Sequence, residues 1–96
     1  MPRRRSIVSY DVSDDKRRDC VFRVLRNFGD SIQFSVFLCE LSATERVRLV
    51  GALHGCIHQR EDRVMIIDLG AVDHEDETRI EWIGRRPEPT PRIRVF

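Results

Sequence analysis

The chain has 96 residues, of which 41% are hydrophobic, 17 are Lys or Arg and 16 are Asp or Glu. These values exclude a disordered chain and predict one small globular domain, whose modest core would gain from dimerisation. No apolar run approaches the ~20 residues of a transmembrane helix, and no signal-peptide core follows the basic start MPRRRS, so we expect a cytoplasmic protein.

Arginine dominates the basic residues, because 16 of the 17 are Arg and only Lys16 is Lys. A guanidinium group binds phosphate in two places, which favours a nucleic-acid partner, whereas a coding bias toward Arg explains the same count equally well. The cysteines Cys20, Cys39 and Cys56 are odd in number and include no CxxC pair. We therefore expect three reduced thiols in a cytosolic protein.

A strand followed by a helix is predicted at the start of the chain. Residues 6–12 have strand composition. Ser13 has the character of an N-cap, with Asp14 and Asp15 in the first turn, where the helix dipole favours negative charge. Apolar residues then recur with helical spacing, and Gly29 stands where a C-cap belongs.

The middle of the chain predicts two further strands and a second helix. Residues 31–41 alternate as a strand does, and their length suggests a turn near Gln33 to Ser35 that splits them in two. The stretch SATE at residues 42–45 is a capping box, which starts a helix that ends near Gly55. The residues expected to point inward from this helix are Val47, Val50, Leu53 and Ile57.

The last part of the chain predicts a buried strand over residues 63–70, an acidic loop over 71–78 and a short fifth strand over 79–84. The element order predicts an α+β, ferredoxin-like βαββαβ domain over residues 1–84 with an extra C-terminal strand. Its two helices would cover one face of the sheet, and a second copy in a homodimer would cover the other. Residues 85–96 form a basic extension with an apolar end, which we expect to dock on the partner subunit.

Asp11 is the candidate site residue, because it follows the first strand and precedes a basic helix. One Asp alone holds a metal ion poorly, but a two-fold dimer would supply two facing carboxylates. A solvated strand end or a partner for Arg is the plainer interpretation. Arg17, Arg18, Arg23 and Arg26 of the following helix are candidates for phosphate contacts, although a charged solvated helix face is the commoner explanation.

His54 and His58 have the spacing of zinc ligands on a helix, but the sequence between them is HGCIH rather than HExxH. Gly55 lies between them and is predicted to end the helix, which argues against a zinc site.

The segments YDVSDDKRR, FG at the end of the first helix, IQFSVFLCEL and the capped second helix together resemble the CRISPR-associated protein two family, often described as an endoribonuclease. The resemblance covers roughly residues 6–70. It implies a homodimer in which two Asp11 residues flank the two-fold axis and bind Mg²⁺, with Mn²⁺ as a substitute. Phe34 stands where many relatives have a basic or polar residue.

The resemblance also implies a role in CRISPR adaptation, in complex with the CRISPR integrase. The expected activity is metal-dependent endonuclease cleavage of single-stranded RNA or double-stranded DNA. In the alternative, the same dimer is a non-catalytic scaffold that holds duplex DNA, with Asp11 purely structural. A third interpretation, a regulatory dimer that binds a small ligand, has only the fold in its favour.

Overall fold

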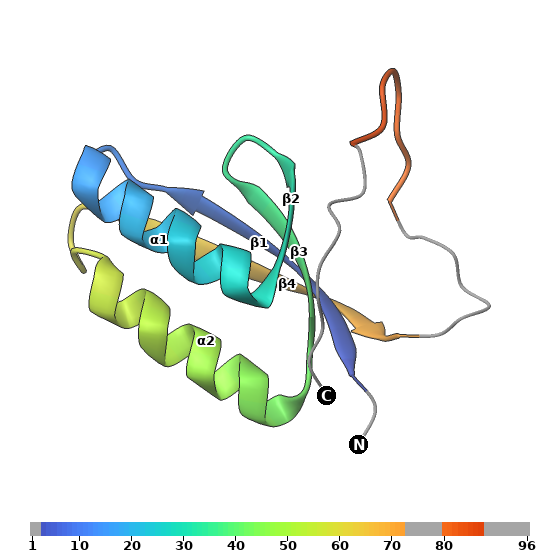
Figure 1. The fold of residues 1–96 in the computed structure, drawn as a ribbon, viewed down its shortest axis with the longest axis horizontal. Coiled ribbons are helices and arrows are strands. Elements are labelled where there is room, and N and C mark those ends of the chain that lie inside the picture. The colour runs from blue at the N-terminus through green and yellow to red at the C-terminus, as the bar shows by residue number, and fades with distance from the viewer. Residues whose placement is uncertain (1–2, 73–79, 88–96) are drawn as a thin grey trace.

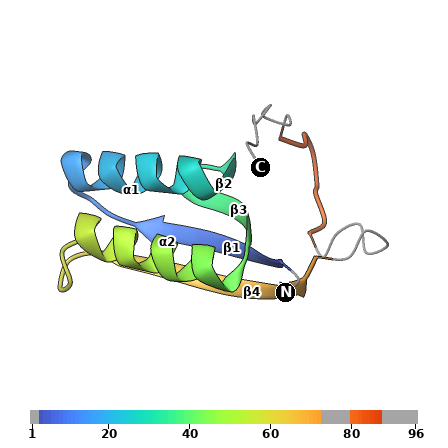
Figure 2. The same cartoon turned by 60° about the horizontal axis from the view of Figure 1, so that its bottom comes forward.

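The computed structural model describes residues 3–72 and 80–87. Its elements are β1 (Arg4–Asp11), α1 (Asp15–Phe28), β2 (Gly29–Gln33), β3 (Val36–Leu41), α2 (Ala43–Cys56) and β4 (Arg63–Ala71). The strands form one antiparallel sheet in the order β2-β3-β1-β4 (Figure 1). This confirms the predicted α+β, ferredoxin-like βαββαβ domain. Both helices lie over the same face of the sheet (Figure 2).

β1 is a central strand, and its successive side chains point alternately to the two faces of the sheet. Ser6, Val8 and Tyr10 are buried toward the helices, and Ile7 and Ser9 on the opposite face are only half-buried. The helix-facing residues join one core with residues of both helices and of β3. Because successive side chains of a strand point to opposite faces, Asp11 belongs to the face opposite the helices.

The predicted split of residues 31–41 is confirmed, since β2 and β3 are joined by a tight turn at Phe34 and Ser35. Ser35 adopts a positive φ of 60°. Gly29 begins β2 directly after α1, and a Cβ there would come within 2.4 Å of the Cys39 Sγ and of the Leu38 carbonyl oxygen. The close approach of β2 to β3 therefore requires glycine at this position.

The helices differ in detail from the sequence prediction. Asp14, rather than Ser13, is the N-cap of α1, and its carboxylate accepts a hydrogen bond from the Arg17 backbone N–H at 2.9 Å. The Ser42 capping box is confirmed. The inward stripe of α2 is confirmed for Leu53, which is buried, and for Ile57, which packs against the core. The prediction is wrong for Val47, which is 72% exposed, and it missed the fully buried Leu49. The helix also continues past Gly55, to Cys56.

β4 was predicted as a buried strand, but within the described residues it pairs with β1 alone and lies at the edge of the sheet. Its outward residues Met65 and Ile67 are 53% and 43% exposed. Residues 80–84 form neither helix nor strand, so the strand predicted over residues 79–84 is not found in its described part. Alternation in a short run does not itself provide the neighbouring strand with which its backbone must pair. The end of the predicted docking extension, residues 88–96, lies outside the described residues.

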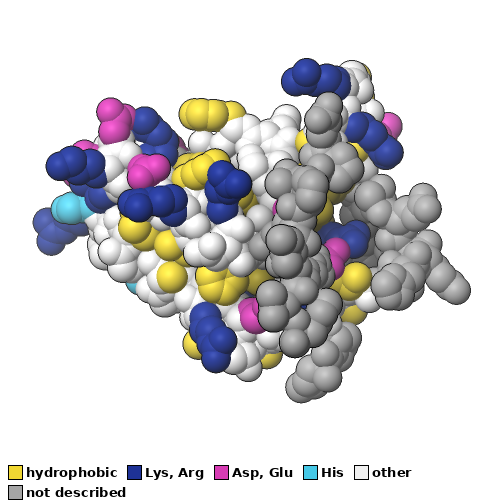
Figure 3. Space-filling view, viewed as in Figure 1, with side chains coloured by type: hydrophobic (Ala, Val, Ile, Leu, Met, Phe, Trp, Pro, Cys, Tyr) yellow, Lys and Arg dark blue, Asp and Glu magenta, His cyan; other side chains and the backbone are white. Residues whose placement is uncertain are grey.

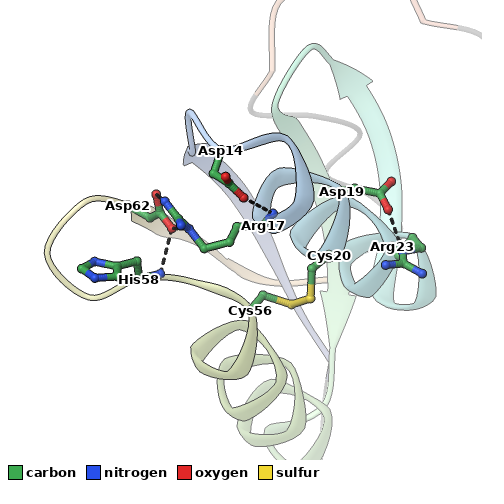
Figure 4. Close-up of a disulfide and its surroundings, with 8 residues drawn as sticks. All are labelled: Asp14, Arg17, Asp19, Cys20, Arg23, Cys56, His58 and Asp62. Atoms are coloured by element: carbon green, nitrogen blue, oxygen red, sulfur yellow. Dashed lines mark hydrogen bonds and ion pairs between the residues drawn. A yellow bond between two sulfur atoms is a disulfide. The ribbon is translucent and has the colours of Figure 1, made fainter.

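Cys20 and Cys56 form a disulfide between α1 and α2, with Cα atoms 5.6 Å apart (Figure 4). The prediction of reduced thiols is therefore wrong for these two, and Cys39 is a thiol buried in the core. The sequence does not predict this disulfide, because 36 positions separate the two cysteines and the packing of α1 on α2 brings them together. In the described part of the chain, neither helix is long and apolar enough to cross a membrane.

Candidate functional site

Asp11 lies at the carboxyl end of β1, directly opposite Arg63 at the start of the neighbouring strand β4. The Arg63 Nε atom is 4.0 Å from the Asp11 Oδ2 atom, and the two side chains are 83% and 80% exposed. An ion pair this exposed stabilises the fold little. Both charged groups are therefore available to a ligand at this end of the sheet.

The turn between β2 and β3 lies on the other side of Asp11. β3 pairs with β1 up to Ser9 and Val36, and the Tyr10 N–H then donates to the Ser35 carbonyl oxygen at 3.1 Å. Before Val36 the chain turns through Phe34 and Ser35 to β2, on the side of β3 away from β1. The Phe34 side chain is 90% exposed. Asp11 is thus flanked by a cation on the β4 side, and the β2–β3 turn meets β1 at Tyr10.

Tyr10 connects this end of the sheet to the core. The residue is only 8% exposed, and its ring contacts Phe37 with 6.4 Å between centroids. Burial raises the pKa of the Tyr10 phenol, while Ser35 and the positive charge of Arg18 act in the opposite direction. The phenol is therefore uncharged at neutral pH and serves as a packing group beneath the site.

Arg18 holds the segment that follows Asp11. One of its Nη atoms donates to the carbonyl oxygens of Val12 at 3.3 Å and Ser13 at 3.2 Å, and the other pairs with Asp15. The guanidinium group thus bridges the end of β1 and the first turn of α1. Its side chain is 37% exposed, so part of it remains accessible to solvent.

Arg17 is bound within the protein (Figure 4). Its Nε donates to Asp62 at 2.7 Å, and its Nη2 contacts Glu61 at 3.1 Å. Asp62 also accepts from the His58 N–H at 2.8 Å. The Arg17 hydrogen bond and then the His58 N–H lower the pKa of the Asp62 carboxyl, and the same contact with Asp62 raises the pKa of Arg17. This cluster ties α1 to the loop between α2 and β4.

Arg23 and Arg26 lie on the exposed side of α1. Arg23 is 72% exposed and pairs with Asp19 at 3.1 Å, while the Arg26 guanidinium lies over the Phe22 ring, 5.7 Å from its centroid. Basic and acidic side chains alternate at the end of the molecule where α1 begins (Figure 3). The predicted phosphate contacts of the four α1 arginines, from Arg17 to Arg26, stay predictions.

The metal-ligand chemistry available here is limited. Among residues 3–72 and 80–87, no group of three or more His, Cys, Asp or Glu side chains lies close enough to hold an ion. His54 contacts Gln59, and His58 accepts from the Arg60 N–H, so each ring has a separate local partner. Mg²⁺ can be held by one or two carboxylates together with water and substrate phosphates. Asp11 fits this requirement as half of a two-carboxylate set.

Arg63 is the site residue that sequence reasoning missed. Phe34 was noticed only as a departure from relatives, and it lies in the turn between β2 and β3. A signal for Arg63 existed, because the end of the first strand meets the start of a strand that runs antiparallel to it. Using that signal requires knowing that β4 is the neighbour of β1, which no local pattern in the chain shows.

Comparison with known proteins gives consistent matches. The family model described as CRISPR associated protein Cas2 matches residues 4–77. A CRISPR-associated endoribonuclease Cas2 from Geobacter sulfurreducens is 31% identical, with 94% of this chain and 94% of that protein aligned. One from Rhodospirillum rubrum is 33% identical, covering 90% of this chain and 83% of that protein.

Two solved structures have the same fold. A hypothetical protein from Thermus thermophilus has a TM-score of 0.75 at 27% identity, and the match covers 92% of this chain and 99% of that one. The structure of Streptococcus pyogenes Cas2 at pH 6.5 has a TM-score of 0.69 at 25% identity. That match covers 83% of this chain and 99% of the other.

Proposed function

Because this chain belongs to the CRISPR associated protein Cas2 family, we propose that it is a Mg²⁺-dependent endonuclease whose site is built on Asp11. Mn²⁺ would replace Mg²⁺. The observation that carries the proposal is the position of Asp11, exposed at the end of a central strand and beside Arg63. A carboxylate that is exposed and held where β1 pairs with β4 suits a metal ion that the substrate must also contact.

A homodimer would complete this site. Besides Asp11, the face of the sheet opposite the helices carries Ile7, Val36, Leu38, Met65 and Ile67, and no described helix lies over it. An apolar sheet face of this kind requires a cover, and a second copy of the chain supplies one. Two-fold pairing through this face would provide one Asp11 from each subunit at the shared site.

In this proposal the chain binds, orients and neutralises the substrate. Asp11 would hold the metal ion through a carboxylate oxygen. Arg63 and the accessible part of Arg18 would bind phosphate oxygens next to the bond to be cut. A bound Mg²⁺ supplies Lewis-acid stabilisation of the phosphate and lowers the pKa of water.

The remaining arginines of α1 would act further along the nucleic-acid backbone. Arg23 and Arg26 are on the exposed side of the helix and would contact phosphates outside the reacting group. Arg17 would contribute by exchanging Glu61 for a phosphate while it keeps its bond to Asp62. The substrate would be single-stranded RNA or double-stranded DNA in the cytoplasm, and the CRISPR integrase would be the partner.

A second candidate is the non-catalytic scaffold, which holds duplex DNA for the integrase. The observation that favours it is that, within the described part of the chain, no group of three or more potential metal ligands gathers at Asp11 or elsewhere. In this alternative the arginines bind the DNA backbone, and neither Asp11 nor a divalent ion is required for binding.

Cleavage of single-stranded RNA and duplex DNA in Mg²⁺, Mn²⁺ or EDTA separates the two candidates. We expect Asp11→Asn to lower the cleavage rate at least about a hundredfold. Asp19→Asn, an exposed carboxylate on α1 away from the site, should leave the rate unchanged. Cleavage that survives Asp11→Asn contradicts the proposal. Absence of cleavage in both proteins, with salt-sensitive duplex binding intact, favours the scaffold.

A further inference from the structure

We propose that a second site, at the end of the sheet opposite Asp11, binds a small organic anion in which a phosphate or carboxylate group is joined to a compact apolar body. The site is a cavity of about 500 Å³ at the end of the sheet where β1 and α2 begin (Figure 1). Arg4 lines the cavity, and Asp11 ends the same strand, about 23 Å away at the usual rise of a strand. The inference therefore does not depend on the proposed function.

The cavity has the size and the walls of a small-molecule site. Such sites measure about 300–1,000 Å³ and combine mainly apolar walls with a few polar groups. Here Leu41, at the end of β3, and Ala43, at the start of α2, contribute apolar side chains to the lining. A ligand with a compact apolar body would therefore bury that body against them.

Ser6 is a buried polar group of the cavity. The residue is 3% exposed and lines the cavity, and it lies between Cys39 of β3 and Asp68 of β4 in the strand pairing. Within the described part of the chain, its hydroxyl has no hydrogen-bond partner. Burying a hydroxyl without a partner costs free energy. A ligand oxygen inside the cavity would accept the missing hydrogen bond.

Arg46 supplies the positive charge. The charge of Arg4 is already balanced, because its Nε and Nη2 atoms donate to Asp68 at 3.0 and 2.8 Å, and Asp68 also accepts from the Gly70 N–H at 2.8 Å. Arg46 forms no ion pair with a described residue. It also lies in the first turn of α2, where the helix dipole disfavours a cation. A bound anion would offset both.

The start of α2 adds backbone donors. The capping box occupies the N–H groups of Ser42 and Glu45, and the Arg46 N–H donates to the Ser42 carbonyl oxygen at 2.9 Å. The N–H groups of Ala43 and Thr44 are left without a partner in the helix. Donors at a helix N-terminus favour an anion. Ser6 and Arg46 make the same choice independently, so the class of ligand does not depend on the helix alone.

A phosphate of a nucleic acid has the same anionic group, but a small molecule fits the cavity better. The unpartnered hydroxyl of Ser6 is buried, so a ligand must enter the cavity to reach it. A backbone phosphate is flanked by two sugars and would stay at the rim, beside Arg46. The buried position of Ser6 therefore favours a ligand that ends in its anionic group.

The test titrates ¹⁵N-labelled protein with phenyl phosphate and, in parallel, with phenol and with inorganic phosphate. We expect saturable shifts of the Ser6, Ala43 and Arg46 amide signals, no shift of Asp11, and weaker binding of the other two probes. Arg46→Gln should weaken phenyl phosphate binding about tenfold or more, because a hydrogen bond to a charged group is lost. Arg48→Gln is the matched control, since Arg48 is exposed on the same helix but does not line the cavity.

Ser6→Ala separates binding from stability. We expect it to weaken phenyl phosphate binding about two- to tenfold, the effect of one hydrogen bond between uncharged and charged partners. Its Tm should not fall, because the hydroxyl has no partner in the free protein. A lower Tm with unchanged binding would make Ser6 a structural residue and contradict the inference.

Three further results would overturn the inference. The first is the absence of saturable shifts at the cavity. The second is an equal loss of binding in Arg46→Gln and Arg48→Gln, which would indicate unspecific attraction to a basic surface. The third is displacement of phenyl phosphate by single-stranded RNA, which would assign the cavity to a nucleic acid. The proposed function fails separately, because cleavage that survives Asp11→Asn does not affect these shifts.

Discussion

Reduction of the Cys20–Cys56 disulfide should destabilise the domain strongly. The bond joins residues 36 positions apart and connects α1 with α2. Closing a loop of that length restricts the unfolded chain, and the chain-entropy relation gives about 3.8 kcal/mol of stabilisation at 25 °C. For a domain of this size, each kcal/mol corresponds to roughly 4–8 °C in Tm. The expected fall in Tm on reduction is therefore roughly 15–30 °C.

The assay is a thermal melt of the same protein with and without a phosphine reductant. Thiol titration of the denatured protein should count one free thiol before reduction, from Cys39, and three after it. Cys39→Ser should keep the full sensitivity to the reductant, and the double variant Cys20→Ser/Cys56→Ser should lose it. Three thiols before reduction, or a melt that the reductant leaves unchanged, would refute the reasoning.

The bond also bears on where the protein works. A reducing cytosol keeps most cysteines as thiols. The reduced protein would then depend on the packing of α1 against α2 and on the Arg17–Asp62 bond, which ties α1 to the loop after α2. The difference in Tm between the oxidised and the reduced protein shows how much stability the disulfide adds to those contacts.

Two further predictions concern the same helices. Asp62 has its pKa lowered in the folded state, so its contribution to stability is present above its unfolded pKa, about 3.9, and is lost as the pH falls through the folded pKa. Asp62→Asn should lower Tm at pH 7. It should also reduce the further fall in Tm between pH 7 and pH 3. An unchanged fall in Tm would show that Asp62 is not the source of this pH dependence. Leu49→Ala should lower the free energy of unfolding, measured with urea, by about 2–5 kcal/mol. Val47→Ala should lower it by less than about 0.5 kcal/mol. Equal losses would contradict the observation that Leu49, and not Val47, faces the core.

Much of the fold could be predicted because its signals are local. The alternation of β1, the turn that splits residues 31–41 and the Ser42 capping box each depend on a few adjacent residues, and all three are found. The errors at helix termini have the same local origin. Ser13 and Asp14 are both good caps, and choosing between them depends on which carboxylate or hydroxyl reaches the Arg17 N–H.

Other features depend on distant pairs and could not be predicted. The stretch around Ile66 and Ile67 is apolar enough for a central strand, but only the sheet order shows that β4 lies at an edge. The disulfide and the Arg17–Asp62 bond likewise join residues 36 and 45 positions apart. The composition shows that the chain is rich in Arg, but it does not show which arginines stabilise the fold and which are exposed.

The residues around Asp11 show why arginines that stabilise the fold must be distinguished from exposed ones. Arg18 follows Asp11 closely in sequence, yet its guanidinium binds the carbonyl groups of the intervening turn and so holds the turn in place. Arg63, which comes 52 positions later, lies directly opposite Asp11. Strand pairing, rather than the neighbouring sequence, therefore decides which groups a substrate meets beside the carboxylate. Exchanging Arg63 should consequently alter substrate binding more than exchanging Arg23, which is nearer to Asp11 along the chain but lies on α1.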